Sequence, residues 1–271
     1  MISTSSPKGL IWEKTLSCAY DSLLTILHNI FAENEDHWLN HLSNLNDFFS
    51  VMSEGWQNNG QESLETVRDR IRYPLSQRDP ASFPYNEREG TDVYALIDQV
   101  FSSPTCQSST EESCPHCHDM LNRSTSSSPF WHLEGKASAT ISKQLQDTLN
   151  TKINKRCRTC LRQLHKTTNF QDNCTPPIIA LSLLNPKLKI QNKLSFRTSA
   201  DSDKTDYSLK GIIYHGQYHF TSRLIDNAGG IWYHDGMTSG RECVYEGKWK
   251  DIQDIYQASG RKASILIYIS T

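Results

Sequence analysis

The sequence lacks any stretch that is long and apolar enough to cross a membrane. Its most apolar stretches, such as "IIALSLL" at 178–184, are far shorter than the roughly 20 residues that a spanning helix requires. The first residues, "MISTSSPKGLIWEK", also lack the charged and then apolar pattern of a signal peptide. We therefore expect an intracellular protein, in the cytoplasm or the nucleus, with no membrane partner.

The chain also lacks a charge imbalance and internal repeats. Its formal net charge is −2 at pH 7, so any basic binding surface must be local. No similarity recurs at a period of about 20–50 residues, which excludes a repeat architecture. A hydrophobic content of 37% and a charged content of 21% are typical of a globular protein. The 271 residues suffice for one large domain or two ordinary ones.

Eight cysteines are present, and four of them form two tight pairs, Cys114/Cys117 and Cys157/Cys160. In a reducing compartment such pairs predict metal ligands before disulfides. Two CxxC pairs can surround one Zn²⁺ tetrahedrally, and metal binding then replaces the core that a small segment lacks. Four thiolates leave no open position, so we expect structural zinc without a catalytic role. The alternative is four unrelated free thiols.

The residues around these pairs have simpler interpretations. His116 and His118 could each replace a cysteine as ligand, but we expect both to be solvated. The basic segment "KINKRCRTCLRQLHK" could bind nucleic acid, but without interleaved aromatic residues a solvated surface is favoured. Three other cysteines have no partner at ligand spacing, and we expect ordinary thiols there, with a second metal or a redox role as the alternative: Cys106, Cys174 and Cys243.

The patterns along the chain predict helices first, then a polar insert, then a β-rich part. Residues 10–101 are mostly helical by apolar spacing, with a helix end expected at Pro74 and a helix start at "GTDVYAL". Residues 102–129 are rich in Ser, Thr, Cys and Pro, which predicts an insertion with little core of its own, and an amphipathic helix follows over 139–153. From 177 onward, runs rich in Ile, Tyr and Leu predict strands and hairpins, with a turn in "IDNAGGIW".

Cys18 stands at the start of an apolar run, "CAYDSLLTILHNIF", whose spacing predicts a helix with one buried face. Free N–H groups and the helix dipole at such an end favour a thiolate. Cys18 is therefore either one more buried thiol or a nucleophile. Asp21 and Ser22 are expected to help the helix begin.

A nucleophilic cysteine needs a histidine to accept its proton and a third group to orient that imidazole. The segment "YHGQYHFTSRLIDNAGGIWYHDG" supplies His219 on one predicted strand and Asp235 after the next. Paired antiparallel strands can bring these side chains within hydrogen-bonding distance. An early cysteine with a late histidine matches the order in papain-like peptidases. A histidine in a β-rich region is more often structural, so chemistry alone leaves the assignment open.

Together these segments resemble the ubiquitin-specific protease family, in the family's order and over nearly the whole chain. "GLIWEKTLSCAYDSLLTIL" is similar to its cysteine box, with Cys18 at the nucleophile. The two CxxC pairs match its fingers, and "PPIIALSLLN" resembles the strand that follows them. "YSLKGIIYHGQYHF" resembles the histidine box, in which His215 matches a non-catalytic histidine and His219 the general base. "WYHDG" places Asp235 third in the triad, and "ASILIYIS" resembles the closing strand.

The resemblance implies an α+β fold of the papain-like, ubiquitin-specific protease type, with residues 1–271 as a single catalytic domain. A helical thumb would comprise 10–101, a zinc-ribbon fingers insert 102–176, and a β-rich palm 177–271. The implied activity is a thiol-dependent isopeptidase that cleaves after the C-terminal Gly-Gly of ubiquitin or a ubiquitin-like modifier. Structural Zn²⁺ is the implied cofactor, and we expect a monomer that does not bind nucleic acid. Aromatic residues beside the triad line the substrate channel in this interpretation, or belong to the core: Tyr218, Phe220 and Trp232.

Departures from the family pattern keep other functions open. The family has an Asn five residues before the nucleophile, whose side chain helps to hold the oxyanion. Here Glu13 stands there, and its charge would oppose the reaction unless it points away. Trp12, Lys14 and the backbone N–H of Cys18 are candidate replacements.

Trp12 and Asp21 look more like the divergent SUMO isopeptidases of the same fold, so a SUMO-specific isopeptidase is one alternative. The substitution at Glu13 leaves open a second alternative, a weak or inactive module that binds a modifier without cleaving it. A zinc protein that binds nucleic acid is the third.

Overall fold

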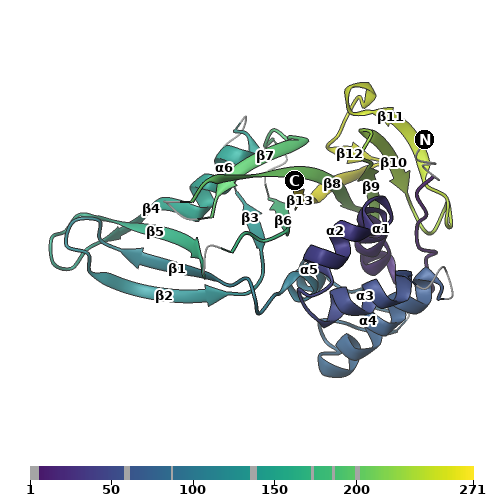
Figure 1. Cartoon of the computed structure of the whole chain (residues 1–271), viewed down its shortest axis with the longest axis horizontal. Coiled ribbons are helices and arrows are strands. Elements are labelled where there is room, and N and C mark those ends of the chain that lie inside the picture. Colours follow the sequence, from purple (N-terminus) through teal and green to yellow (C-terminus); the bar gives the residue numbers. More distant parts are fainter. Residues whose placement is uncertain are drawn as a thin grey trace.

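The computed structural model describes residues 6–57, 62–86, 88–134, 139–171, 174–184, 187–198 and 202–271. Figure 1 shows the helices of the first hundred residues at one end of the molecule and a four-stranded sheet projecting at the other, with a nine-stranded sheet joining them. Among the residues described, no helix is long and apolar enough to cross a membrane.

The helical part consists of α1 (Cys18–Glu33), α2 (Glu35–His37), a π-helical turn (Trp38–Leu42), α3 (Asp47–Gln57), α4 (Leu64–Arg78) and α5 (Val93–Phe101). Nearly every side chain of α1 is buried, because this helix lies between the other helices and the large sheet. The predicted start of α5 is confirmed: the Asp92 side chain caps the helix by accepting from the Tyr94 N–H (2.8 Å).

The prediction that a helix ends at Pro74 is wrong, because α4 continues to Arg78. A proline removes one amide donor from a helix, but the following turn still closes, with the Asp79 N–H donating to the Leu75 carbonyl (2.9 Å). Leu75 and Ser76 are both buried, so packing of this turn outweighs the missing hydrogen bond.

The large sheet has the strand order β11-β10-β9-β8-β13-β6-β3, with β7 paired to β8 and β12 paired to β13. Its strands are β3 (Phe130–Leu133), β6 (Ile178–Leu183), β7 (Lys193–Arg197), β8 (Lys204–Gly216), β9 (His219–Ile225), β10 (Gly230–His234), β11 (Val244–Lys248), β12 (Gln257–Ala258) and β13 (Arg261–Ser270). β3 runs parallel to β6, and the other neighbours are antiparallel. The strands and the hairpin turn predicted after residue 177 are confirmed.

Both faces of this sheet are covered, which explains the apolar runs in its strands. Alternate residues of β13 belong to different cores: Ile265, Ile267 and Ile269 pack with the helices, whereas Leu266 packs on the other side. α6 (Ile141–Leu149) covers that second side with its apolar face. α6 is shorter than the helix that the sequence predicts over 139–153.

α1 lies directly against β8 and β9. Gly211 of β8 permits this close approach, because a Cβ there would lie 2.4 Å from the Ile26 side chain of α1. The helix that begins with Cys18 is thereby fixed to the strand that leads toward His219.

The four-stranded sheet has the order β2-β1-β5-β4 and is formed by β1 (Ser108–Ser113), β2 (Met120–Ser126), β4 (Asn150–Arg156) and β5 (Gln163–Phe170). Its apolar cluster is small and consists mainly of cysteines, with Leu164 and Ile153 beside them. The expectation of little core in this insert is confirmed. The boundaries of the insert remain a prediction, and two elements within 102–176, β3 and α6, pack with the large sheet.

Cys106 and Cys174 form a disulfide, so the expectation of two ordinary thiols there is wrong. The chain enters the four-stranded sheet beside the point where it leaves, and the Gln171 N–H donates to the Gln107 carbonyl (2.8 Å). This pairing brings together two cysteines that are 68 residues apart in the sequence. Cys243 is a free, buried thiol, as expected.

Candidate functional site

Cys18 is the first residue of α1 and follows Ser17 at the N-cap. Cys18 therefore belongs to the first turn, whose backbone N–H groups have no acceptor within the helix. Cys18 is a free thiol that is 7% exposed. The predicted position at a helix start is confirmed.

His219 and Asp235 come together at one end of the β9–β10 hairpin. His219 Nε2 donates to Asp235 Oδ1 at 2.8 Å, and both residues are buried. The Cys18 side chain lies close enough to the His219 imidazole to favour its protonated form and raise its pKa. The three residues proposed as a triad from the sequence therefore lie in contact in the order that nucleophilic catalysis requires.

The surroundings of His219 favour the imidazolium form. Burial opposes that charge, but the hydrogen bond to Asp235, together with the hydrogen bond to Cys18 and its charge, raises the pKa of His219 to about 9. Burial likewise acts to raise the pKa of Asp235, but the bond and charge of His219 outweigh it and lower that pKa. The site thus favours a protonated His219 ring beside an ionised Asp235 carboxylate.

Asp235 is fixed by the turn that follows β10. Its Oδ1 also accepts from the Met237 N–H (3.1 Å), and the Ser239 hydroxyl donates to its carbonyl (2.9 Å). The Trp12 N–H donates to the Gly236 carbonyl (3.2 Å), which joins this turn to the segment before Cys18. A Cβ at Gly236 would lie 2.4 Å from the Leu10 carbonyl oxygen. Glycine is therefore required where the two segments meet.

The raised pKa of His219 gives a pH prediction. The folded-state pKa, about 9, lies above the ordinary value of 6.5, so the protonated ring contributes stability that is complete below pH 6.5 and is lost as pH rises through about 9. If His219 acts as a general acid, turnover should fall along the same alkaline limb, because the protonated ring is then lost. A kcat–pH profile measures the limb. A limb near pH 6.5 would contradict the imidazolium assignment.

The segment before Cys18 is held by one face of α4. Arg68 donates to the Ile11 carbonyl (3.0 Å) and forms an ion pair with Glu13. Glu65 accepts from the Ile11 N–H (2.9 Å) and, on its other oxygen, from Arg241 (2.6 Å), which lies beyond Asp235 in the chain.

Arg72, one turn along α4, donates to the Thr15 hydroxyl (2.7 Å) and to the Thr15 carbonyl. Sequence reasoning missed Arg68 and Arg72, which are both completely buried. The available signal is weak: two arginines four residues apart in "ETVRDRIRYPL" share a helix face. Their acceptors lie 57 residues earlier in the chain.

The two side-chain candidates for an oxyanion donor differ in their surroundings. The indole Nε1 of Trp12 is enclosed and, among the described residues, has no hydrogen-bond partner. Lys14 is exposed. A buried N–H group without a partner is costly, so Trp12 carries an unused donor beside the nucleophile segment.

The three candidate channel residues lie in different environments. Tyr218 and Gln217 form the two-residue turn between β8 and β9, both with positive φ, and Tyr218 is fully exposed. Phe220 and Trp232 are partly buried against the core of the helical part. Phe220 also stacks on His215, with ring centroids 4.4 Å apart.

The four paired cysteines form one cluster at the end of the four-stranded sheet. Their sulfur atoms all lie within 4.8 Å of one another, and the shortest separations are 3.4 Å. Tetrahedral zinc with bonds of about 2.3 Å needs sulfur atoms about 3.8 Å apart. The donor set and its spacing therefore fit Zn²⁺. His116 lies outside the cluster, with Nδ1 3.3 Å from Arg162.

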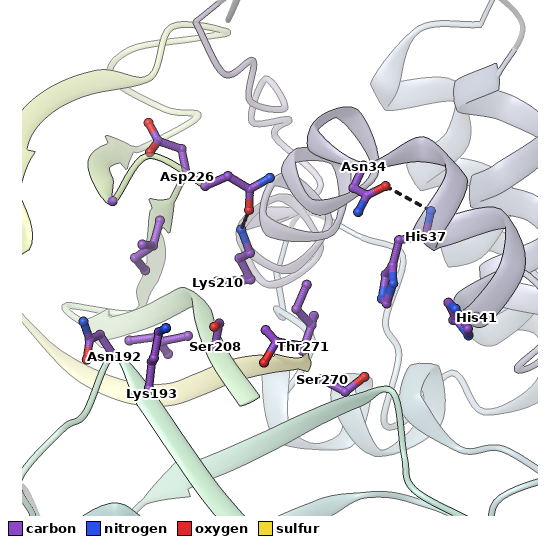
Figure 2. Close-up of a pocket in the computed structure, with 15 residues that line it drawn as sticks. Asn34, His37, His41, Asn192, Lys193, Ser208, Lys210, Asp226, Ser270 and Thr271 are labelled. Atoms are coloured by element: carbon purple, nitrogen blue, oxygen red, sulfur yellow. Dashed lines mark hydrogen bonds between the residues drawn. The ribbon is translucent and has the colours of Figure 1, made fainter. Parts of the chain in front are cut away.

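A pocket of 620 Å³ lies at the opposite end of α1 from Cys18. Figure 2 shows His37 and His41 facing Lys210 and the ends of strands across it. Lys210 is paired with Glu33 (2.8 Å) and Asn227 (2.5 Å). No triad residue lines this pocket, so it is separate from the candidate catalytic site.

No protein-family model and no curated protein matches the sequence. Among solved structures, the chain is similar to a chain of the SAGA DUB module Ubp8/Sgf11/Sus1/Sgf73 bound to monoubiquitin, with 14% identity and a TM-score of 0.60, covering 97% of this chain and 69% of that one. It is also similar to a chain of the yeast SAGA DUB module with a mutant Sgf73, with 14% identity and a TM-score of 0.53, covering 97% and 68%. At this identity the likeness shows the fold alone. The chain has a mixed α/β fold like that of a ubiquitin-specific protease, which confirms the resemblance seen in the sequence at that level.

Proposed function

We propose that the protein is a cysteine isopeptidase that removes ubiquitin or a ubiquitin-like modifier by cleaving after its C-terminal Gly-Gly. The observation that carries this proposal is the contact of His219 with both Cys18 at the start of α1 and Asp235 after β10. Nucleophile, base and orienting carboxylate are thus assembled from distant parts of the chain.

The reaction follows from these positions. The Cys18 thiolate attacks the carbonyl carbon of the terminal glycine, and the His219 imidazolium gives its proton to the departing lysine amine. A thioester between Cys18 and the modifier remains. Water then attacks it while His219 takes a proton from that water, which releases the modifier with a free carboxylate and restores Cys18. Asp235 keeps the ring oriented in both steps, as its 2.8 Å bond to Nε2 allows.

Ubiquitin is the modifier that we propose, since one solved neighbour is bound to monoubiquitin. The SUMO interpretation becomes an outcome of the test. We propose to compare fluorogenic amides of ubiquitin and SUMO as substrates, with Cys18→Ala as the control. Cleavage of the ubiquitin amide is expected. Cleavage of the SUMO amide alone would favour the SUMO isopeptidase, and ubiquitin binding without cleavage would favour the inactive module.

The proposed cofactor is a structural Zn²⁺ ion, which would be held by Cys114, Cys117, Cys157 and Cys160 and would stabilise the projecting sheet. Asp119 accepts from Thr159 (2.5 Å) and lies beside Cys157, which orders the second pair. We propose that this sheet supports the body of the modifier, and that the protein works inside the cell as a monomer.

Trp12 is the side-chain donor that we propose for the oxyanion. Trp12→Phe removes the N–H group and keeps the ring, so we expect kcat to fall about 100-fold with little change in KM. Steady-state kinetics on the ubiquitin amide measure both constants. Lys14→Met tests the rival donor, and a larger loss in that variant than in Trp12→Phe would transfer the role to Lys14.

Of the three candidate channel residues, Tyr218 is the one whose backbone conformation, with a positive φ, most favours a functional role. A side chain at positive φ costs about 1–2 kcal/mol, and the Tyr218 ring gains no burial in return. Tyr218→Asn suits this turn better, so we expect unchanged or higher thermal stability but a KM for the ubiquitin amide that is about tenfold higher. Gln217→Asn is the matched control in the same turn. An unchanged KM in Tyr218→Asn would remove the residue from the channel.

A further inference from the structure

Two carboxylates lie on either side of the nucleophile in the chain, Glu13 five residues before it and Asp21 three residues after it. Asp21 is in the first turn of α1, and residues three apart share a helix face. A negative charge at Asp21 would therefore repel a thiolate at Cys18. By the resemblance to the family's cysteine box, Glu13 stands where negative charge develops during acyl transfer.

Arg68 contacts both of these carboxylates. Its Nη1 donates to Asp21 Oδ1 at 3.0 Å, and its Nη2 forms the ion pair with Glu13. The Arg68 side chain is completely buried, Asp21 nearly so, and Glu13 is half-buried. Buried charges interact strongly because little water screens them.

These contacts close into a ring that includes Ser17, the residue before Cys18. The Ser17 hydroxyl donates to Asp21 Oδ2 (2.6 Å) and accepts from the Glu13 N–H (2.9 Å). Arg68 joins Glu13 back to Asp21. The turn from Glu13 to Ser17 is thereby held at both ends, and Cys18 follows directly.

The electrostatics agree with this geometry. Burial raises the pKa of Asp21 to about 6, and the charge of Arg68 opposes that rise. Without Arg68, the pKa of Asp21 would rise further and the buried carboxyl would tend to take up a proton, so the anion that anchors this turn would be lost.

We propose that Arg68 is a positioning residue of this peptidase, which cancels the charges of Glu13 and Asp21 and fixes the turn that delivers Cys18 to His219. The inference rests on the proposed function. It also explains how a glutamate is tolerated at position 13, since its carboxylate is bound to α4.

The test combines three variants with two readouts. In Arg68→Met we expect kcat to fall about 100-fold, with KM within about threefold, because Arg68 does not face the substrate. Cys18 alkylation by iodoacetamide, which needs no modifier, should slow about tenfold, since the unpaired Glu13 carboxylate and the released turn disfavour a reactive thiolate. The double variant Arg68→Met/Glu13→Gln should recover at least part of both losses, because one unpaired charge is removed.

Glu13→Gln alone should lower kcat much less than Arg68→Met does, because Asp21 still binds Arg68 and keeps the turn in place. A tenfold rise in that variant would overturn the proposal. So would normal alkylation of folded Arg68→Met protein, or a double variant no better than the single one. Arg70→Met is the matched control on the same helix, since Arg70 pairs with Glu54 and Glu62 away from the site. Failure of wild type to cleave any modifier would contradict the proposed function, while the alkylation results would still decide the role of Arg68.

Discussion

Replacing His219 with glutamine is expected to lower turnover of the ubiquitin amide on the order of 10⁴-fold. Glutamine keeps a polar side chain of similar reach, but it can neither hold a proton for the leaving amine nor stabilise the Cys18 thiolate. The loss should appear in kcat, because His219 acts on the reacting atoms. Asp235, at 2.8 Å, only orients its ring.

The control for this variant is His132→Gln, which changes an exposed histidine on β3. It should leave kcat within about threefold, as is usual for surface substitutions. Circular dichroism checks that both variants are folded. If folded His219→Gln protein retained more than a tenth of wild-type turnover, the assignment of the general base would be wrong.

Removal of zinc is the second change with a large expected effect. Structural zinc sites contribute about 10–16 kcal/mol of apparent binding free energy, and the four-stranded sheet has only a small cluster of cysteines, Leu164 and Ile153 as its core. We therefore expect Cys114→Ser, or a chelator, to unfold this sheet. Hydrogen exchange over 108–126 and 150–170 should become fast while α1 and the large sheet stay protected.

Metal analysis accompanies this experiment and should give one zinc per chain in wild-type protein. Cys243→Ser is the matched control, since Cys243 is a buried free thiol outside the cluster. KM for the ubiquitin amide should rise in Cys114→Ser, because the projecting sheet is proposed to support the modifier. Substoichiometric zinc in folded wild-type protein would contradict the structural role of the cluster.

The sequence was informative wherever a pattern is local or a residue type has a special use. The apolar spacing after Cys18 predicts α1, the apolar run in β13 reflects its two covered faces, and two CxxC pairs predict one cluster. The order of cysteine, histidine and aspartate left the assignment open, and the resemblance to a family named the three residues that the structure brings close together.

The residues that sequence reasoning missed act over long distances. Arg68 and Arg72 reach acceptors 57 residues away, and no periodicity records such a contact. The disulfide between Cys106 and Cys174 depends on where the insert enters and leaves the fold. The continuation of α4 past Pro74 depends on burial of its last turn, which tertiary packing decides.

Glu13 is easily misinterpreted from the sequence for the same reason, because its partner Arg68 is distant in the chain. From the sequence its carboxylate opposes catalysis, and only the position of α4 supplies the cation that binds it. A departure from a family motif is therefore best judged together with the groups that contact it.

The most direct test is covalent capture by ubiquitin that carries a C-terminal electrophile. Wild-type protein should form one adduct, and peptide mapping by mass spectrometry should place it on the sulfur at the start of α1. Alanine at that position should abolish it without unfolding the chain. A folded, zinc-loaded protein that forms no adduct, or one that reacts through another thiol such as Cys243, would contradict the account.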